Sequence, residues 1–437
     1  MRKLMYIFML LLIANKSIAQ TAMTVPSVDK ETYELYLAKD WNKLIKTGKK
    51  ALKNGIDFYY LNYRLGIACY EKQNYIQAVK YFKKIHKTNP NDDTLNEYLY
   101  YSYLFAGHYD QARNLGYYFT DKMKTRLGIR TVNPFFSSAE LAFKIDFIDD
   151  YSYNNQLNQD VEQQINQKQT WYGFGLEHLA GAKTTIMGAY SKVNTESFNY
   201  DINPDLPDEY IGNVVQNQYY ISLKQYLGSG FSTALGLHLL SSTFSSPTVT
   251  SQQGPRGMRS SNLYFYEGKS FVAAANISKS FSIFNTTLET SIANLNNKTQ
   301  VQPSLSLRIY PFGNAKFYSD TKGIYISEND NGTKTNYSAI KQSFAFKIKK
   351  YSYISSSVTF GELVNYTDFN ASLVNNNVDI LKLQFNNYLN IGFNNGLFNL
   401  YANFQYSIKE NTYKVNDIEK SIEYNSQSIL FGAKWYF

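Results

Sequence analysis

The chain has 437 residues, a formal net charge of +9 and a mean hydropathy of −0.39, with 40 tyrosines, 29 phenylalanines and 9 prolines. Its single cysteine, Cys69, excludes a disulfide framework and a zinc site built from cysteines. Tyrosine-rich composition with much serine and asparagine, and no long apolar run after the N-terminus, favours antiparallel sheet. It suits in particular a transmembrane barrel, which has aromatic girdles and a polar lumen.

The first 19 residues have the pattern of a secretory signal peptide. Residues 1–3 are basic, residues 6–14 are apolar, and Ser17-Ile18-Ala19 forms a small-x-small cleavage site before Gln20. The apolar stretch is shorter than the ~20 residues of a membrane helix, and no later segment approaches that length. No cysteine follows the stretch, so a lipid anchor is not expected. We therefore expect an exported protein with a signal peptide at 1–19.

Residues 27–125 have helical spacing and an internal period of 34 residues, marked by Trp41, Tyr75 and Tyr109. Each of these aromatics follows a polar residue and stands three positions before an aliphatic one. The middle copy is the clearest, and proline after its second helix ends that helix. The residues expected to pack the repeats together are Trp41, Gly66, Tyr75, Ala78, Phe82, Pro90, Tyr109 and Ala112. This spacing resembles the tetratricopeptide repeat family, which implies an α-solenoid of about three repeats over residues 27–125, within a domain at 20–128.

A stack of helical hairpins forms a concave face that can hold a peptide or a helix. The spacing directs five residues toward it as a candidate partner-binding groove: Tyr60, Tyr63, Tyr70, Glu97 and Tyr101. The alternative is that these side chains pack against the next repeat or the next domain. Residues 20–128 carry a net charge of +6 and residues 129–437 carry none, which weakly favours an acidic partner over a merely solvated helical surface.

From about Pro134 the period changes to two. Leu141, Phe143, Ile145 and Phe147 alternate with polar or small residues, and similar segments of ten residues or more follow over some 300 residues. Strands of a soluble sandwich are shorter, whereas tilted strands that cross a bilayer need about this length. We predict an antiparallel transmembrane β-barrel at 129–437 with about 14 strands, 12–16 being compatible with the pattern.

The links between these segments alternate in length. Short turns are expected near 180–182, 228–230, 280, 311–314, 349–350 and 394–396, and longer loops near 150–167, 194–213, 244–262, 294–298, 327–335, 366–379 and 410–422. An even number of strands places both termini on one side, which for an exported chain is the periplasm. The expected location is thus the outer membrane, with the N-terminal domain in the periplasm.

If the apolar series faces lipid, charged residues of both signs face the lumen. These are Glu140, Lys144, Asp146, Glu177, Lys224, Glu289, Arg308 and Lys382, and also Lys341 and Lys347. Buried charges need water or partners. Structural pairing across the lumen and an ion-selective channel are both compatible with the pattern.

The chain ends on a strand with apolar residues at every second position: Ile429, Phe431, Ala433, Trp435 and Phe437. This segment resembles the C-terminal signal of outer-membrane barrels, which the barrel-assembly machinery recognises. The resemblance implies that this machinery is a partner during biogenesis.

Catalytic and cofactor motifs are not evident. The four histidines are His86 and His108, expected on exposed helix positions, and His178 and His238, in predicted strands; Glu177 faces away from His178. No phosphate-binding loop or metal-ligand cluster is found. We expect no enzymatic activity, no cofactor, no metal and no nucleic-acid partner.

The combination resembles periplasmic tetratricopeptide arrays fused to outer-membrane barrels, such as surface lipoprotein assembly modulators and exopolysaccharide export porins. That resemblance implies an export or assembly factor: the repeats recruit a periplasmic or surface client, a protein or a polysaccharide, and the barrel translocates or presents it. The alternatives are a diffusion porin and a closed barrel that anchors a protein-interaction scaffold. The composition also resembles envelope proteins of the Gram-negative Bacteroidota.

Overall fold

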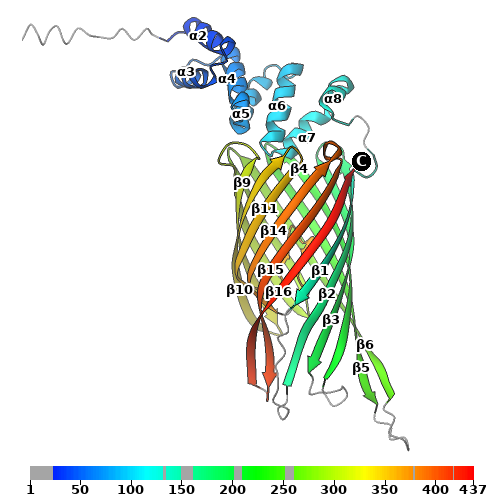
Figure 1. Cartoon of the computed structure of the whole chain (residues 1–437). Coiled ribbons are helices and arrows are strands. Elements are labelled where there is room, and N and C mark those ends of the chain that lie inside the picture. The colour runs from blue at the N-terminus through cyan, green and yellow to red at the C-terminus, as the bar shows by residue number, and fades with distance from the viewer. Residues whose placement is uncertain are drawn as a thin grey trace, which may run out of the picture. The chain divides into compact units, whose positions relative to one another are not determined.

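The computed structural model describes residues 23–130, 134–148, 161–200, 209–250, 260–376, 379–416 and 418–437. The chain divides into two compact units, residues 1–102 and residues 103–437, which are described separately (Figure 1).

The first unit is helical. It contains α2 (Val25–Leu37), α3 (Trp41–Lys53), α4 (Tyr59–Glu71), α5 (Tyr75–His86) and most of α6 (Asp93–Phe105). Helices α2, α4 and α6 begin 34 residues apart, and so do α3, α5 and α7 (Tyr109–Tyr117). The period seen in the sequence is therefore a period of helical hairpins.

Local chemistry sets where these helices begin. Asp40 and Asn74 cap α3 and α5, and each side chain accepts a hydrogen bond from a backbone N–H of the first turn. The core between the helices is formed by Leu44, Leu65 and Phe82, which are all 0 % exposed.

Gly66 permits the close approach of α4 and α5. A Cβ atom there would lie 2.4 Å from Cε1 of Phe82, so any larger residue would collide with this ring. The glycine of the repeat pattern is thus required by packing.

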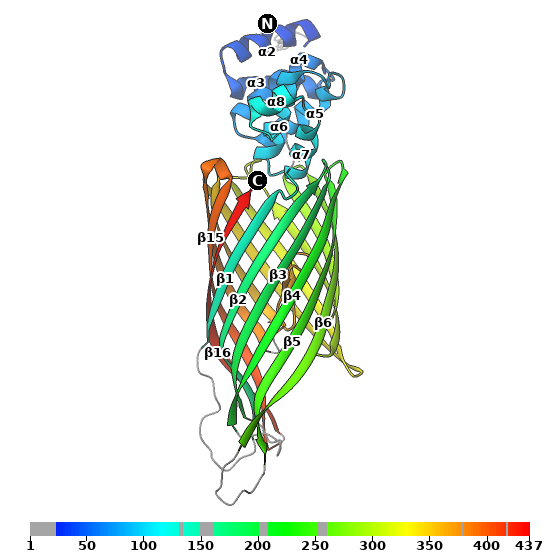
Figure 2. The same cartoon turned by 90° about the vertical axis from the view of Figure 1, so that its right-hand side faces the viewer.

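The second unit contains α7, α8 (Asp121–Leu127) and a closed antiparallel barrel (Figures 1 and 2). The described residues form a barrel of fourteen strands, the number that the alternation predicts. The strands are β1 (Ser138–Ile148), β2 (Val161–Ala180), β3 (Thr184–Tyr200), β4 (Glu209–Gly228), β5 (Phe231–Thr250), β6 (Ser260–Phe281), β7 (Phe284–Leu295), β8 (Lys298–Ile309), β9 (Phe317–Asp330), β10 (Thr333–Lys349), β11 (Ser352–Leu363), β14 (Ile380–Phe393), β15 (Phe398–Val415) and β16 (Ile418–Tyr436). Neighbours in sequence are neighbours in the barrel, and β1 pairs with β16 to close it.

The short turns lie where they were expected, at the end of the barrel that holds the C-terminus (Figure 1). At the other end, the prediction of long loops near 294–298 and 327–335 is wrong. The strands continue there into two-residue turns at Asn296-Asn297 and Asn331-Gly332, whose residues all have positive φ. Asparagine and glycine adopt this conformation readily, so polar sequence at these positions encodes a tight hairpin. The segment 410–422 is likewise mostly strand.

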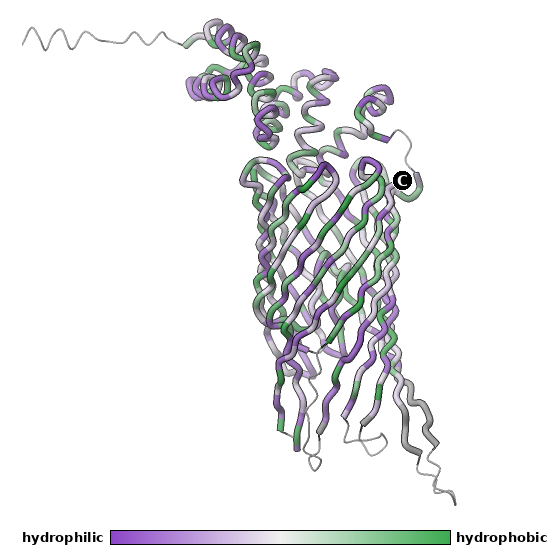
Figure 3. The backbone as a smooth tube through the Cα atoms, viewed as in Figure 1, coloured by the Kyte–Doolittle hydropathy of each residue, from purple (hydrophilic) through white to green (hydrophobic). Residues whose placement is uncertain are grey.

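Hydrophobic and hydrophilic residues alternate along the barrel strands (Figure 3). The exposed residues of the alternation are mostly apolar and the buried ones mostly polar, so the outer face is apolar and the inner face polar. On β7, for example, Leu288 and Ile292 are more than half exposed, whereas Glu289 and Ser291 are buried. At the end with the short turns, outward aromatic rings pair across neighbouring strands: Phe281 with Phe284, Phe317 with Phe346, and Phe398 with Trp435. An apolar exterior with an aromatic rim is the pattern of strands that cross a bilayer.

Among the described helices, none is both long and apolar enough to span a membrane.

Candidate functional site: a chain segment inserted into the barrel lumen

Residues 364–376, between β11 and β14, fold into the interior of the barrel. They include a short hairpin of β12 (Thr367–Asp368) and β13 (Leu373–Val374) that stands apart from the barrel sheet. We call residues 364–376 the inserted segment. Its residues contact the inner faces of β4 to β10, and Asn365, Thr367 and Ala371 are almost fully buried. The prediction of an ordinary external loop near 366–379 is therefore wrong for its described residues: polar inner-wall groups hold most of it inside.

The wall strand β8 binds the backbone of the inserted segment. Gln302 donates to the carbonyl oxygen of Thr367 at 2.7 Å and accepts from its N–H at 3.0 Å. Gln300, two residues earlier, donates to the carbonyl oxygen of Asn365 at 2.7 Å. The hydroxyls of Ser291 and Thr367 are hydrogen-bonded at 2.9 Å. Main-chain groups of Asn365 and Thr367 thus bind alternate residues of β8, and the hydroxyl of Thr367 adds a side-chain contact to Ser291 on β7.

A buried ion cluster holds the tip of the segment. Asp368 lies 2.6 Å from Lys322 on β9 and 2.9 Å from Lys341 on β10, measured between carboxylate oxygens and Nζ atoms. Lys322 also lies 3.4 Å from Glu289 on β7, whose other oxygen accepts from the N–H of Asn370 at 3.1 Å. Because these groups are withdrawn from water, each depends on its partners.

The far side of the segment turn contacts β4 and β5. Tyr220 donates to the carbonyl oxygen of Asn370 at 3.1 Å, and Nδ1 of His238 lies 2.7 Å from the carbonyl oxygen of Ala371. Ala371 is completely buried in an apolar cluster with Leu240, Val272, Ala274, Ala293 and Leu295. Phe369, by contrast, is 66 % exposed and lies under the Lys341 ammonium, 5.2 Å from the ring centroid.

Helix α7 reaches the inner wall at the short-turn end of the same unit. The carboxylate of Asp110 lies 2.9 Å from Nζ of Lys224 on β4 and accepts from the hydroxyl of Ser232 on β5 at 2.8 Å. Arg113 donates to the hydroxyl of Thr185 on β3 at 2.6 Å. These contacts attach α7 to three neighbouring strands.

Nine of the ten charged residues predicted for the lumen have a polar partner among the described residues, and the tenth, Lys347, is exposed. The pairs, besides Lys224–Asp110 and Glu289–Lys322, are Lys144–Asp146 at 3.0 Å, Glu140–Lys434 at 3.7 Å, Arg308–Asp320 at 2.8 Å, Lys382 with Glu362 at 2.8 Å and with Glu410 at 2.5 Å, and Glu177 with the hydroxyl of Ser137 at 3.4 Å. Four of these partners, Lys434, Asp320, Glu362 and Glu410, lie on adjacent strands. Of the predicted charges, Glu289 and Lys341 belong to the site around the inserted segment.

The structure distributes the predicted groove residues over two environments. Tyr63 and Tyr70 belong to an aromatic cluster with Phe82, Tyr75 and Tyr98. Tyr60 is 61 % exposed and Tyr101 contacts the ring of Tyr100, while Glu97 is half-buried.

The predicted packing residues are also divided. Gly66, Ala78, Phe82 and Ala112 are buried, and Trp41 contacts Tyr36. Pro90 is exposed after α5, and Tyr109 is 62 % exposed. The third aromatic of the period therefore does not fill a seam as Tyr75 does.

The C-terminal strand β16 pairs with β15 along its whole length and with β1 over eleven residues. Phe431, Trp435 and Phe437 point outward and are 40–58 % exposed. The N–H of Phe437 donates to the carbonyl oxygen of Ser137 at 3.0 Å, so the last residue is fixed at the closing seam.

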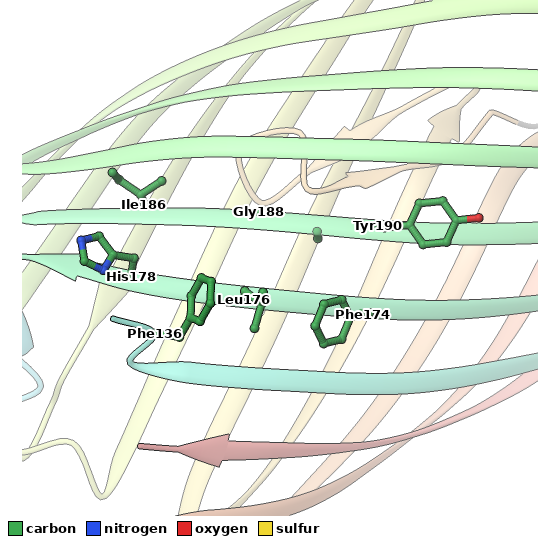
Figure 4. A pocket seen from close by; sticks show the side chains of 8 residues that line it. Phe136, Phe174, Leu176, His178, Ile186, Gly188 and Tyr190 are labelled. Atoms are coloured by element: carbon green, nitrogen blue, oxygen red, sulfur yellow. The ribbon is translucent and has the colours of Figure 1, made fainter. Parts of the chain in front are cut away.

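His86 and His108, expected at exposed helix positions, are half-buried and buried, whereas His238 lies on a strand, β5, as predicted. His108 is buried at the start of α7, where its ring centroid lies 6.3 Å from that of Tyr103. His238 is buried against the inserted segment. His178 lies on the outer face of β2, beside a depression of about 320 Å³ that is lined by apolar residues such as Phe136, Phe174 and Ile186 (Figure 4). Groups of three or more metal-ligating side chains do not occur among the described residues.

Sequence reasoning missed the inserted segment. Its usable signal was the apolar residues Tyr366 and Val374 within a loop, because an external loop gains nothing from residues that need burial.

No protein-family model matches the chain, and no curated protein matches it either. Among solved structures, it is similar to a FadL homologue of Pseudomonas aeruginosa, with a TM-score of 0.44 and 10 % identity over 69 % of this chain and 90 % of that one. The toluene transporter TbuX of Ralstonia pickettii is similar with a TM-score of 0.43 and 5 % identity, over 69 % of this chain and 89 % of that one. The translocator domain of the autotransporter NalP from Neisseria meningitidis is similar with a TM-score of 0.33 and 9 % identity, over 72 % of this chain and 95 % of that one. Scores this low assign no family, and the fold rests on the strand topology of the chain itself.

Proposed function

We propose that the protein is a non-enzymatic export or assembly factor of the Gram-negative outer membrane. In this proposal the helical hairpins, which resemble tetratricopeptide repeats, recruit a client or partner in the periplasm. The barrel then translocates the client or presents it at the cell surface. The observation that carries the proposal is a closed barrel with an apolar exterior, whose lumen holds a segment of its own chain, joined to a unit of helical hairpins.

The charge distribution supports this assignment of roles. Residues 20–128 carry a net charge of +6, whereas the barrel half is neutral, so an acidic client is attracted to the helical half. Tyr60 is exposed on α4 and lies beside Arg64, 5.8 Å from ring centroid to guanidinium carbon. It is therefore a suitable place to detect a bound client.

Photo-cross-linking in cells tests recruitment. A photoreactive amino acid replaces Tyr60 in the full-length chain, and Lys46, exposed on α3, is the matched control. We expect position 60 to capture a defined set of envelope proteins or glycans and position 46 to capture much less. If both positions give the same background products, client recruitment by this surface is wrong.

A diffusion channel is the second candidate, and the narrowed lumen is the observation that favours it. In that case the inserted segment is a fixed constriction, and the native chain conducts steadily in planar bilayers. If the segment is instead a displaceable closure, the native chain conducts little, and shortening residues 365–374 to a Gly-Ser linker raises the conductance severalfold. Steady conductance of the native chain at the level of the shortened variant would exclude the gated export factor.

A further inference from the structure

We propose that the inner wall formed by β7 to β10 is a binding site for an extended polypeptide that carries an aspartate. In this proposal the inserted segment is the internal occupant of the site, and a client segment displaces it. That the displacing chain is an export client rests on the proposed function. The existence of a polypeptide-binding site on the wall does not depend on it.

The first argument is that side chains of β8 form hydrogen bonds with main-chain groups of the inserted segment. Gln302 satisfies both the N–H and the carbonyl oxygen of Thr367, and Gln300 bonds the carbonyl oxygen of Asn365. The two glutamines are alternate residues of one strand, and their partners are alternate residues of the inserted segment, of which Thr367 lies in β12 and Asn365 has a φ of 48°. Extended polypeptides present N–H and C=O groups to one side at every second residue, so the wall matches a polypeptide repeat. These three hydrogen bonds use main-chain groups of the bound residues, whereas the side chains of Asn365 and Thr367 bond separately to Asn296, Glu328 and Ser291.

The second argument is the charge of the wall. Lys322 and Lys341 converge on one carboxylate, that of Asp368, and Glu289 accepts the N–H two residues further along. Removal of the segment leaves two lysines and one glutamate, a local excess of one positive charge. An incoming carboxylate restores the balance, whereas an uncharged chain leaves the Lys341 ammonium without a carboxylate and Lys322 with Glu289 as its only ionic partner among the described residues.

The third argument is that the inserted segment does not use everything the wall offers. Oε1 of Gln300 has no hydrogen-bond partner within the described residues, although the same atom of Gln302 accepts a backbone N–H. Next to this wall, Nε2 of His238 on β5 and Nδ2 of Asn370 in the segment itself are also buried without partners among those residues. Unsatisfied buried groups disfavour the bound state. A more regular strand that delivers its N–H to Gln300 would therefore bind better than the chain's own segment.

The fourth argument is backbone strain in the segment. Phe369, Asn370 and Ala371 are consecutive residues with φ of 53°, 58° and 63°, a region that side-chain-bearing residues disfavour. This turn directs the chain back toward β14 after its contacts with the wall. Only a segment that is connected to the barrel at both ends needs such a turn. A client passing through the barrel has no such turn. The segment is thus suited to hold the site in the absence of a client and to leave it when one arrives.

Planar-bilayer block of the shortened variant, with residues 365–374 replaced by a Gly-Ser linker, tests the site. The probe is a synthetic peptide of residues 363–375 (LVNYTDFNASLVN). We expect the peptide to block the current, and we expect a peptide with Asp368→Asn to need about a tenfold higher concentration. In the channel, Lys322→Gln, Lys341→Gln and Gln302→Leu each weaken the block. The matched control Lys382→Gln, an inner-wall lysine paired with Glu362 and Glu410, leaves the block unchanged.

Two results would overturn the proposal. A scrambled peptide of the same composition that blocks equally well would show that charge alone is recognised. An acidic polysaccharide such as alginate that blocks with the same dependence on Lys322 and Lys341, while the peptide does not, would assign the site to glycans.

A second measurement uses the intact chain, in case the shortened variant does not fold. Fluorescence anisotropy follows binding of the labelled peptide to the native chain and to its Asp368→Asn variant. We expect about tenfold tighter binding to the variant, whose own segment competes less well. Equal binding to both would contradict the proposal. Peptide binding with no client captured at position 60 would sustain the wall site and refute the recruitment model.

Discussion

The ring of Tyr401 on β15 lies directly over Gly432 on β16: a Cβ atom on Gly432 would come within 2.1 Å of the tyrosine ring. The two residues are paired in register across the strands. The hydroxyl of Tyr401 donates to the carboxylate of Glu140 on β1. One side chain therefore spans the closing seam from β15 across β16 to β1, and the missing side chain of Gly432 makes room for it.

Gly432→Ala should impair closure of the barrel, because even one methyl group displaces the ring of Tyr401 from the seam. The fraction of folded barrel, measured by heat-modifiable migration on SDS gels, should fall clearly below that of the native chain. Gly323→Ala on β9 is the matched control, since a Cβ atom there meets nothing within 4 Å. Equal folded fractions for both variants would refute this role of the glycine.

Deletion of Phe437 should lower the amount of barrel in the outer membrane. The resemblance of the last strand to an assembly signal predicts slower recognition, and the deletion also removes the backbone bond to Ser137. Phe312→Ala is a suitable control because it removes another exposed aromatic from the short-turn end of the barrel without changing β16. Fractionated cells, compared by immunoblot, should show a loss for the deletion and little change for the control. Normal membrane levels of the deletion variant would show that Phe437 is not part of a signal.

The sequence predicts the regular parts of this molecule well, because their signals are local. The 34-residue period follows from side chains that pack between neighbouring helices, and the alternation along β7 or β15 follows from two faces with different surroundings. The tight hairpin at Asn331-Gly332 was misread because polarity alone does not distinguish a turn from a loop. The inserted segment depends on partners 65 residues away, such as Gln302 for Thr367, and no local pattern encodes that pairing.

Asp368→Asn should loosen the inserted segment and increase the conductance of the full-length chain. The substitution leaves Lys322 and Lys341 facing a neutral group in a buried site, and breaking such a pair costs about 3–5 kcal/mol. The open fraction in planar-bilayer recordings should therefore rise at least about tenfold. Glu362→Gln is the matched control, because its partner Lys382 lies outside the cluster and the side chain of Glu362 is 51 % exposed. A conductance change of the same size in both variants would indicate a general loosening of the barrel instead.

The helical unit should lose stability in alkali. Burial raises the pKa of the Cys69 thiol from 9.0 to about 11, and burial likewise raises the pKa values of Tyr63 and Tyr81 to about 12. Below pH 9 these groups are neutral in both the folded and the unfolded chain. Above it the thiol ionises first in the unfolded chain, so stability falls from pH 9 to about 11, and the tyrosines extend the loss from pH 10 to about 12.

Iodoacetamide labelling of Cys69, the single cysteine of the chain, measures this effect in the full-length protein. The thiol is 2 % exposed, so labelling requires opening of the helical unit. The labelling rate at each pH is divided by that of the fully unfolded chain at the same pH, because iodoacetamide reacts with the thiolate. The urea concentration at half-labelling corrected in this way should be constant from pH 7 to 8.5 and decrease steadily from pH 9 to 11. For the Cys69→Ala variant, unfolding is followed by the helical circular-dichroism signal instead. Its urea midpoint should begin to decrease at a pH about one unit higher, because only the tyrosines remain to ionise. A urea midpoint that does not change between pH 8 and 11 would show that these groups ionise without opposing the fold.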